Sequence, residues 1–286
     1  GLPYNQKGNF SAGFLPPQHQ GTIVNTNGRE PIAHLAASPH AKYVTAEAEN
    51  AGLAVLAELN RDHAREVGSD PRLEARIEAY ELAAKMQLSA PEVFDLARES
   101  QAMHSLYGVN EPATEDFGRR CLLARRMIER GVRFVQVWSG AGGPTNNWDN
   151  HTNIASELPA MCGATDKPIA GLLVDLKQRG LLDDTLVLWT TEFGRMPFSQ
   201  GNGGRDHNGG VFAGWMCGAG VKPGVSFGES DPWSWQAASD VTTTYDFHAT
   251  VLHLLGIDHE QLTVRNNGAN RRLTDVHGHV IREVLG

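Results

Sequence analysis

The stretch LLDDTLVLWTTEFGRMPFSQGNGGRDH, residues 181–207, decides the fold that the sequence predicts. Its segment Thr185–Thr190 is a short run of β-forming residues behind an Asp-Asp turn, which is typical of a strand covered on both faces in a parallel sheet. Glu192 follows almost at once, and a glycine-rich loop then leads to His207. Because open α/β sheets bind ligands at the carboxyl ends of their strands, we expect the chemistry of this protein at that edge.

Strands and helices alternate through the second half of the chain. The patterns predict further strands at Arg133–Trp138 and Val211–Cys217, and helices over Glu157–Arg179, over Thr244–Gly256 and within Leu273–Leu285. In the first of these helices, the sequence favours a break near Gly163 and a restart at Pro168. Such alternation indicates βαβ units, and therefore an α/β fold with a mainly parallel sheet.

The first part of the chain has a different character. Residues 1–40 are rich in Gly, Pro, Asn and Gln, which predicts an extended arm or loop. Apolar residues at helical spacing predict a helical region over residues 41–130, whose last helix stops at Gly131. We therefore expect one α/β domain over residues 41–286, with this helical part followed by a β/α part over residues 131–286.

Composition excludes several classes of protein. The net charge of −8 argues against a general nucleic-acid binder, which usually carries a basic face. No apolar run approaches the roughly 18 residues that a membrane-spanning helix needs. The three cysteines are far apart and form no CxxC pair, so a zinc-thiolate site is not expected.

Acidic and histidine side chains follow the predicted strands in a pattern that suits a metal ion. Asp149 and His151 stand two residues apart in the loop after the first predicted strand, and Glu192 and His207 follow the next one. Such a mixed oxygen and nitrogen set suits a divalent metal, namely zinc, manganese or iron, with calcium as a further candidate. Any one of these residues alone is better explained as a solvated loop residue, but several at successive strand ends favour a metal site.

These motifs carry a resemblance to a known family. TLVLWTTEFGR and DFHATVLHLLGI resemble segments of the alkaline phosphatase superfamily and its sulfatases. With FGRRCLLARRMIERGVRFVQV, WDNH, GRDH and RRLTDVHGHVI, most of residues 111–285 is similar to an uncharacterised bacterial, sulfatase-like and often exported family, the domain of unknown function 1501. The resemblance implies a three-layer α/β/α fold, periplasmic or secreted location, and metal-dependent hydrolysis of phosphate or sulfate esters.

The resemblance also implies roles for particular residues. Asp149, His151 and His207 would bind one metal, and Glu192 would bind a second or bridge the two. A second set of polar residues has a less direct link to the metal. It comprises two candidate anion-binding arginines, Arg195 and Arg205, whose alternative is a surface ion pair, and three further candidates, Asn153, Asp206 and His248. Asn153 could be the metal ligand in place of His151. His248 has no direct counterpart in the superfamily, and its alternative is a hydrogen bond to a backbone group at the start of its helix.

The chain departs from the superfamily pattern in ways that leave the activity open. It contains no apolar strand ending in a metal-binding Asp and no recognisable nucleophile, so it resembles a C-terminal part lacking roughly the first two-fifths. WDNH spaces its Asp and His two apart where the superfamily has four, and Asn153 falls at the four-residue position. Glu192 replaces the usual Asp.

Two functional hypotheses follow. One is a hydrolase of small-molecule or saccharide phosphate or sulfate esters, and the other is a non-catalytic metal-binding or interaction module without a nucleophile. In an intermediate case a second chain completes the site. Trp233 and Trp235 add either an aromatic wall for a sugar or ordinary packing within their own domain.

Overall fold

The computed structural model describes residues 12, 15, 19–26, 31–32, 45–68, 77, 91–140 and 148–286. Residues 139–286 form one compact unit, and the described residues before them belong to another. Most of the predicted arm over residues 1–40 lies outside the described residues. Within the described part, no helix has the length and apolar character needed to cross a membrane.

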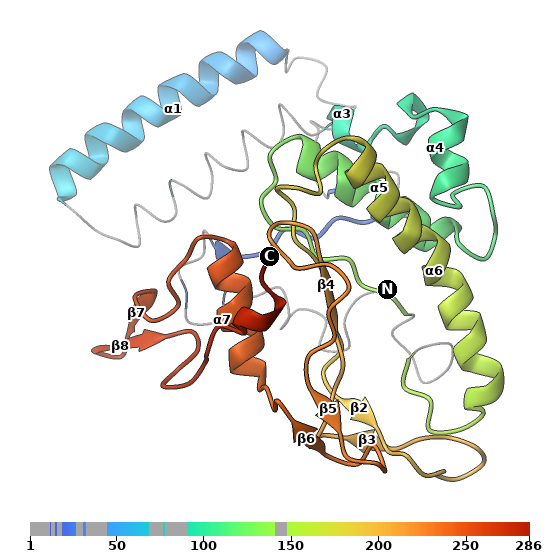
Figure 1. Cartoon of the computed structure of the whole chain (residues 1–286). Helices are drawn as coiled ribbons and strands as arrows, with labels where there is room; N and C mark the ends of the chain where they lie inside the picture. The colour runs from blue at the N-terminus through green and yellow to red at the C-terminus, as the bar shows by residue number, and fades with distance from the viewer. Residues whose placement is uncertain are drawn as a thin grey trace. The chain divides into compact units, whose positions relative to one another are not determined.

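The elements of the two units are short apart from three helices (Figure 1). The helices of the unit before residue 139 are α1 (Ala46–Val67), α3 (Pro91–Phe94), the 3-10 turn η3 (Leu96–Arg98), α4 (Gln101–Leu106) and α5 (Glu115–Glu129). The second unit contains α6 (Ile154–Gln178), β1 (Val187–Trp189), β2 (Gly194–Arg195), β3 (His207–Asn208), β4 (Trp215–Cys217), β5 (Glu229–Ser230), β6 (Ala237–Ser239), α7 (Thr244–Leu254), β7 (Thr263–Asn266), β8 (Ala269–Arg272) and the 3-10 turn η4 (Arg282–Val284).

Helix α5 carries the buried centre of the first unit. Its apolar stripe includes Leu122, which is fully buried, and the helix ends before Gly131, whose φ of 84° stops it as the sequence predicts. Arg125 is buried on the same helix and forms ion pairs of 2.9 Å with Glu99 and 2.6 Å with Glu129. These carboxylates compensate a guanidinium that would otherwise be costly to bury.

The predicted parallel sheet, and with it the three-layer α/β/α fold, is wrong. In the described residues the strands form four separate antiparallel pairs, β1 with β4, β2 with β3, β5 with β6, and β7 with β8. A parallel pair needs a crossover of a dozen or more residues, usually a helix. Residues 190–214, between β1 and β4, contain β2 and β3 but no helix, so the chain returns antiparallel.

Two of the predicted strands are present but shorter than the sequence predicts. Val187–Trp189 is the strand portion of the predicted Thr185–Thr190, and Trp215–Cys217 is that of Val211–Cys217. The predicted strand Arg133–Trp138 is wrong: this segment has no regular secondary structure, it pairs with no strand of the described residues, and its Phe134 is exposed. A β-forming composition alone is therefore not enough to form a strand here, because no described segment supplies a ladder partner.

The helices of the second unit follow the sequence more closely. Helix α6 confirms the helix predicted over Glu157–Arg179, but it passes Gly163 without the predicted break. It also contains Pro159 and Pro168. Both lie beyond the first turn of a helix that begins at Ile154, so each proline removes one backbone hydrogen bond from α6.

Helix α7 confirms the predicted helix and explains why the last one is absent. Thr243 and Asp246 form a reciprocal capping box at its start. Asp246 and Thr250 also accept hydrogen bonds, of 2.7 and 2.9 Å, from the backbone amides of His279 and Ile281. The C-terminal segment is thereby held against α7 in an extended form, so the helix predicted within Leu273–Leu285 is wrong except for the short turn η4.

Candidate metal centre

Two segments far apart in the sequence build the candidate site. The first is the loop that contains Asp149 and His151 and leads into α6, and the second is the β2–β3 hairpin. In that hairpin Arg195 lies directly opposite His207. Its glycine-rich loop is joined to the first segment by backbone hydrogen bonds, including one of 3.0 Å from the amide of Arg205 to the carbonyl of Asn150.

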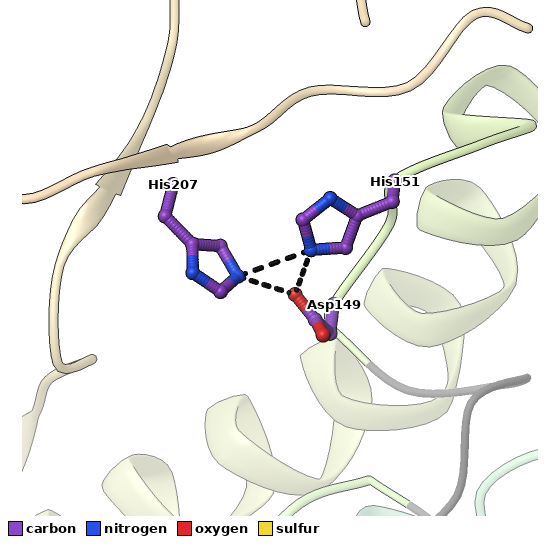
Figure 2. A group of neighbouring side chains, drawn as sticks. All are labelled: Asp149, His151 and His207. Carbon is purple, nitrogen blue, oxygen red and sulfur yellow. Dashed lines mark hydrogen bonds and ion pairs between the residues drawn. The ribbon is translucent and has the colours of Figure 1, made fainter. Parts of the chain in front are cut away.

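Asp149, His151 and His207 converge on one point, as Figure 2 shows. Asp149 Oδ1 lies 2.8 Å from Nε2 of His207 and 3.0 Å from Nε2 of His151. The two imidazole Nε2 atoms are 3.1 Å apart. All three side chains are partly exposed, so the point on which they converge is open to solvent.

A single cation satisfies this triangle better than protons do. When Nδ1 of neutral His151 carries the proton, Nε2 of His151 and Oδ1 of Asp149 are two acceptors 3.0 Å apart, and the proton on Nε2 of His207 has to serve both of them. A normal bond length for a divalent metal with imidazole and carboxylate ligands is about 2.05 Å. A point at this distance from all three ligand atoms lies about 1.1 Å outside the plane that they define. The three atoms subtend angles of roughly 90° at that point, as in a two-His, one-carboxylate facial set with open positions.

Neighbouring groups orient the two rings. Nδ1 of His151 lies 2.9 Å from Oε1 of Gln200. An amide oxygen can only accept, so Nδ1 is the donor and Nε2 of the neutral ring keeps its lone pair for a metal. Asp206 lies further out, with Oδ1 3.9 Å from the same Nδ1. The Phe193 ring, with its centroid 4.3 Å from that of His207, packs against the second imidazole.

Arg195 controls the charge of Asp149. Its Nη2 donates to Asp149 Oδ1 at 2.7 Å and to the carbonyl of Trp148 at 3.1 Å. Partial burial of Asp149 favours the neutral acid, but hydrogen bonds from His207 and Arg195, with the nearby positive charge, outweigh it and lower the pKa to about 2. The carboxylate is therefore ionised and ready to bind a cation at neutral pH.

The remaining predicted residues lie outside this triangle. Glu192 is exposed, and its Oε2 accepts from the hydroxyl of Thr191 at 3.0 Å. Asn153 occupies the N-cap position of α6 with a φ of 51° and makes no side-chain capping bond there. His248 bonds the carbonyl of Thr244 through Nδ1 at 2.8 Å, one turn back on α7. Arg205 donates to the carbonyl of Met196 at 3.2 Å.

Two residues that support the site were not predicted. Gln200 gives no signal in the sequence, because a glutamine in a polar loop is ordinary. Gly204 is buried, and a Cβ atom there would lie 1.9 Å from the backbone carbonyl of His151. The glycine-rich loop was a visible signal of this close approach, since glycine marks places where two backbones come together.

Comparison with known proteins gives a family but no activity. A family model described as a protein of unknown function, DUF1501, matches residues 1–285. No curated protein and no solved structure gives a significant match. The match covers nearly the whole chain, including both segments of the candidate metal centre. The chain therefore belongs to the DUF1501 family of proteins of unknown function.

Proposed function

We propose that this protein is a metal-dependent hydrolase of phosphate or sulfate esters, with one divalent metal held by Asp149, His151 and His207. One observation carries the proposal: three ligand atoms of the right kinds lie within 4.8 Å of one another on partly exposed side chains, so a metal bound there would have positions left for water and substrate. Catalytic metal sites keep such positions, whereas structural zinc sites fill them with protein ligands. The proposal rests on the site alone, because function does not follow from fold.

The residues present suit hydrolysis. A divalent metal there would polarise an ester oxygen and lower the pKa of a water molecule beside it. Arg195, whose guanidinium is 2.7 Å from Asp149, adds positive charge next to the open face, which favours an anionic substrate. In the reaction, a water oxygen bonds to phosphorus or sulfur, the bond to the ester oxygen breaks, and the departing alcohol takes up a proton.

One observation favours a non-catalytic metal-binding module as the second candidate. Both candidate anion-binding arginines donate to backbone carbonyls, Arg195 to that of Arg205 at 3.1 Å and Arg205 to that of Met196 at 3.2 Å. Guanidinium groups engaged in this way hold the loop and have fewer donors for a substrate. In this case the metal binds without turnover, or turnover needs a second chain that supplies a nucleophile.

Metal content and turnover of the purified protein test the proposal together. Elemental analysis should find close to one equivalent of a transition metal in the wild type and far less in Asp149→Ala and His207→Ala. Turnover of p-nitrophenyl phosphate or p-nitrophenyl sulfate should fall in parallel and should return when zinc, manganese or iron is added to the EDTA-treated wild type.

His253→Ala is the matched control, because it removes an exposed imidazole on α7. It should change neither metal content nor turnover. Equal metal content in the wild type and in both triad variants would refute the metal site. Bound metal without turnover of either ester would refute the hydrolase and leave the binding module.

A further inference from the structure

The exposed aromatic side chains of the unit that contains the triad include Phe198 in the loop between β2 and β3, and Trp233 and Trp235 in the turn between β5 and β6. Trp233 is 78% exposed, Trp235 is 41% exposed and Phe198 is 49% exposed. The rings of Phe198 and Trp235 contact each other, with centroids 5.2 Å apart and planes inclined by 32°. Large aromatic side chains are usually buried, so a group of them left in water is a candidate ligand surface.

Hydrogen bonds close the turn that carries the two tryptophans. Oδ1 of Asp231 accepts from the backbone amides of Trp233 and Trp235, at 3.1 and 2.8 Å. The amide of Asp231 donates to the carbonyl of Gln236 at 2.8 Å, which closes the turn between β5 and β6. Ser234 between the two tryptophans has a φ of 56°, in the left-handed region. These bonds fix the backbone that carries the two tryptophans, at a local conformational cost.

This aromatic surface adjoins the candidate metal centre through two short connections. Asn208, the residue after His207, is buried and donates to the carbonyl of Trp235 at 3.0 Å. Phe198 stands two residues before Gln200, the partner of His151, a separation of at most about 7 Å along the chain. Figure 1 agrees, with β5 and β6 beside β2 and β3.

We propose that Phe198, Trp233 and Trp235 form a saccharide-binding platform beside the metal triad, so that the ester to be cleaved is carried on a sugar. This inference rests on the proposed function for the nature of the ester. The carbon–hydrogen faces of a pyranose ring stack on flat aromatic side chains, because the face of the ring system is electron-rich. Side chains of the same turn, those of Ser234 and Gln236, can bond the hydroxyl groups around such a sugar.

The size of the surface favours a sugar over a protein. A stable protein interface buries about 800 Å² on each partner. Three aromatic side chains that are already part-buried offer well under that area, since even a whole tryptophan contributes at most about 250 Å². One or two sugar rings match the surface, and the anionic ester on such a sugar would reach toward Arg195 and the triad.

A glycan array with neutral, sulfated and phosphorylated saccharides tests the platform. The wild type should bind a subset of the glycans, and Trp233→Ala and Trp235→Ala should each weaken that binding about tenfold. Tyr245→Ala is the control, because Tyr245 is also 41% exposed and lies on α7 outside the platform. Binding to no glycan, or binding that both tryptophan variants retain in full, would overturn the proposal.

The same array separates the platform from the hydrolase. Asp149→Ala should lose metal and ester turnover but keep tryptophan-dependent binding to the neutral glycans. If p-nitrophenyl esters are cleaved and no saccharide binding depends on the tryptophans, the platform fails and the hydrolase stands. If saccharides bind through the tryptophans and no ester is cleaved, the hydrolase fails and the surface remains a saccharide site.

Discussion

Replacement of Asp149 by Asn should remove a pH-dependent contribution to the free energy of unfolding that the charged carboxylate makes in the wild type. The carboxylate oxygen accepts hydrogen bonds from His207 at 2.8 Å and from Arg195 at 2.7 Å. Asparagine keeps the shape and one oxygen acceptor but removes the negative charge. The substitution therefore isolates the electrostatic part of these contacts in the metal-free protein.

The expected magnitude follows from the pKa of Asp149. The pKa is about 2 in the folded chain against an ordinary value of 3.8. At full strength this difference corresponds to about 2.4 kcal/mol at neutral pH. The side chain is 52% exposed, however, and solvent screening reduces the contribution to about 1 kcal/mol. Because the folded pKa is the lower one, this stabilisation is present above pH 3.8 and is lost as the pH falls toward 2.

Urea unfolding of the EDTA-treated wild type and of Asp149→Asn, from pH 7 down to about pH 2, measures the difference in their free energies of unfolding. The wild type should be about 1 kcal/mol more stable than Asp149→Asn near pH 6, and the two curves should converge below about pH 3. Asp183→Asn, which changes an exposed carboxylate in the turn before β1, controls for the loss of one surface charge. A constant gap between wild type and Asp149→Asn across the whole range would refute the electrostatic account.

Three further substitutions test the packing of the chain. Gly204→Ala places a Cβ atom 1.9 Å from the carbonyl carbon of His151, so it should displace the loop that carries His151 and weaken metal binding at least tenfold in a metal titration. In the control Gly209→Ala the new Cβ atom meets nothing within 4 Å, so metal binding should be unchanged. Arg125→Met removes the ion pair with Glu129 and leaves Glu99 with Arg126 as its remaining ion-pair partner, so it should cost about 3 kcal/mol in urea unfolding; a loss below about 1 kcal/mol would contradict this. Thr243→Ala removes a helix cap and should cost about 1 kcal/mol, measured in the same way, and an unchanged midpoint would show that α7 does not need the cap.

The sequence identified the elements whose signals are local. Helix α7 begins at a capping box, Thr243 with Asp246, and α5 ends before Gly131 with its positive φ. Both signals lie within a few residues of the feature they specify, so no knowledge of distant partners is needed. The same holds for Asp149 and His151, whose two-residue spacing already places them in one loop.

Strand pairing depends on distant residues, and there the prediction failed. The run around Val187–Trp189 has the composition of a buried parallel strand, yet its partner is Trp215–Cys217 in the antiparallel direction. Composition reports that a segment is extended and partly covered, and it does not report the direction of the neighbour. Glu192 was grouped with the triad by the same reasoning about parallel strand ends, whereas Phe193 is the residue of this segment that contacts His207.

The ends of parallel strands therefore do not bring Asp149, His151 and His207 together, and contacts between two segments of the main chain do. The two segments are joined by main-chain contacts, with the amides of Asn153 and Ile154 donating to the carbonyls of Asn202 and Gly203, both at 3.1 Å. These bonds fix the loop whether or not a metal is present, and in this the centre differs from zinc fingers, where binding and folding are one event. A metal bound at this site would therefore contribute little to folding, so most of its binding free energy would appear as affinity.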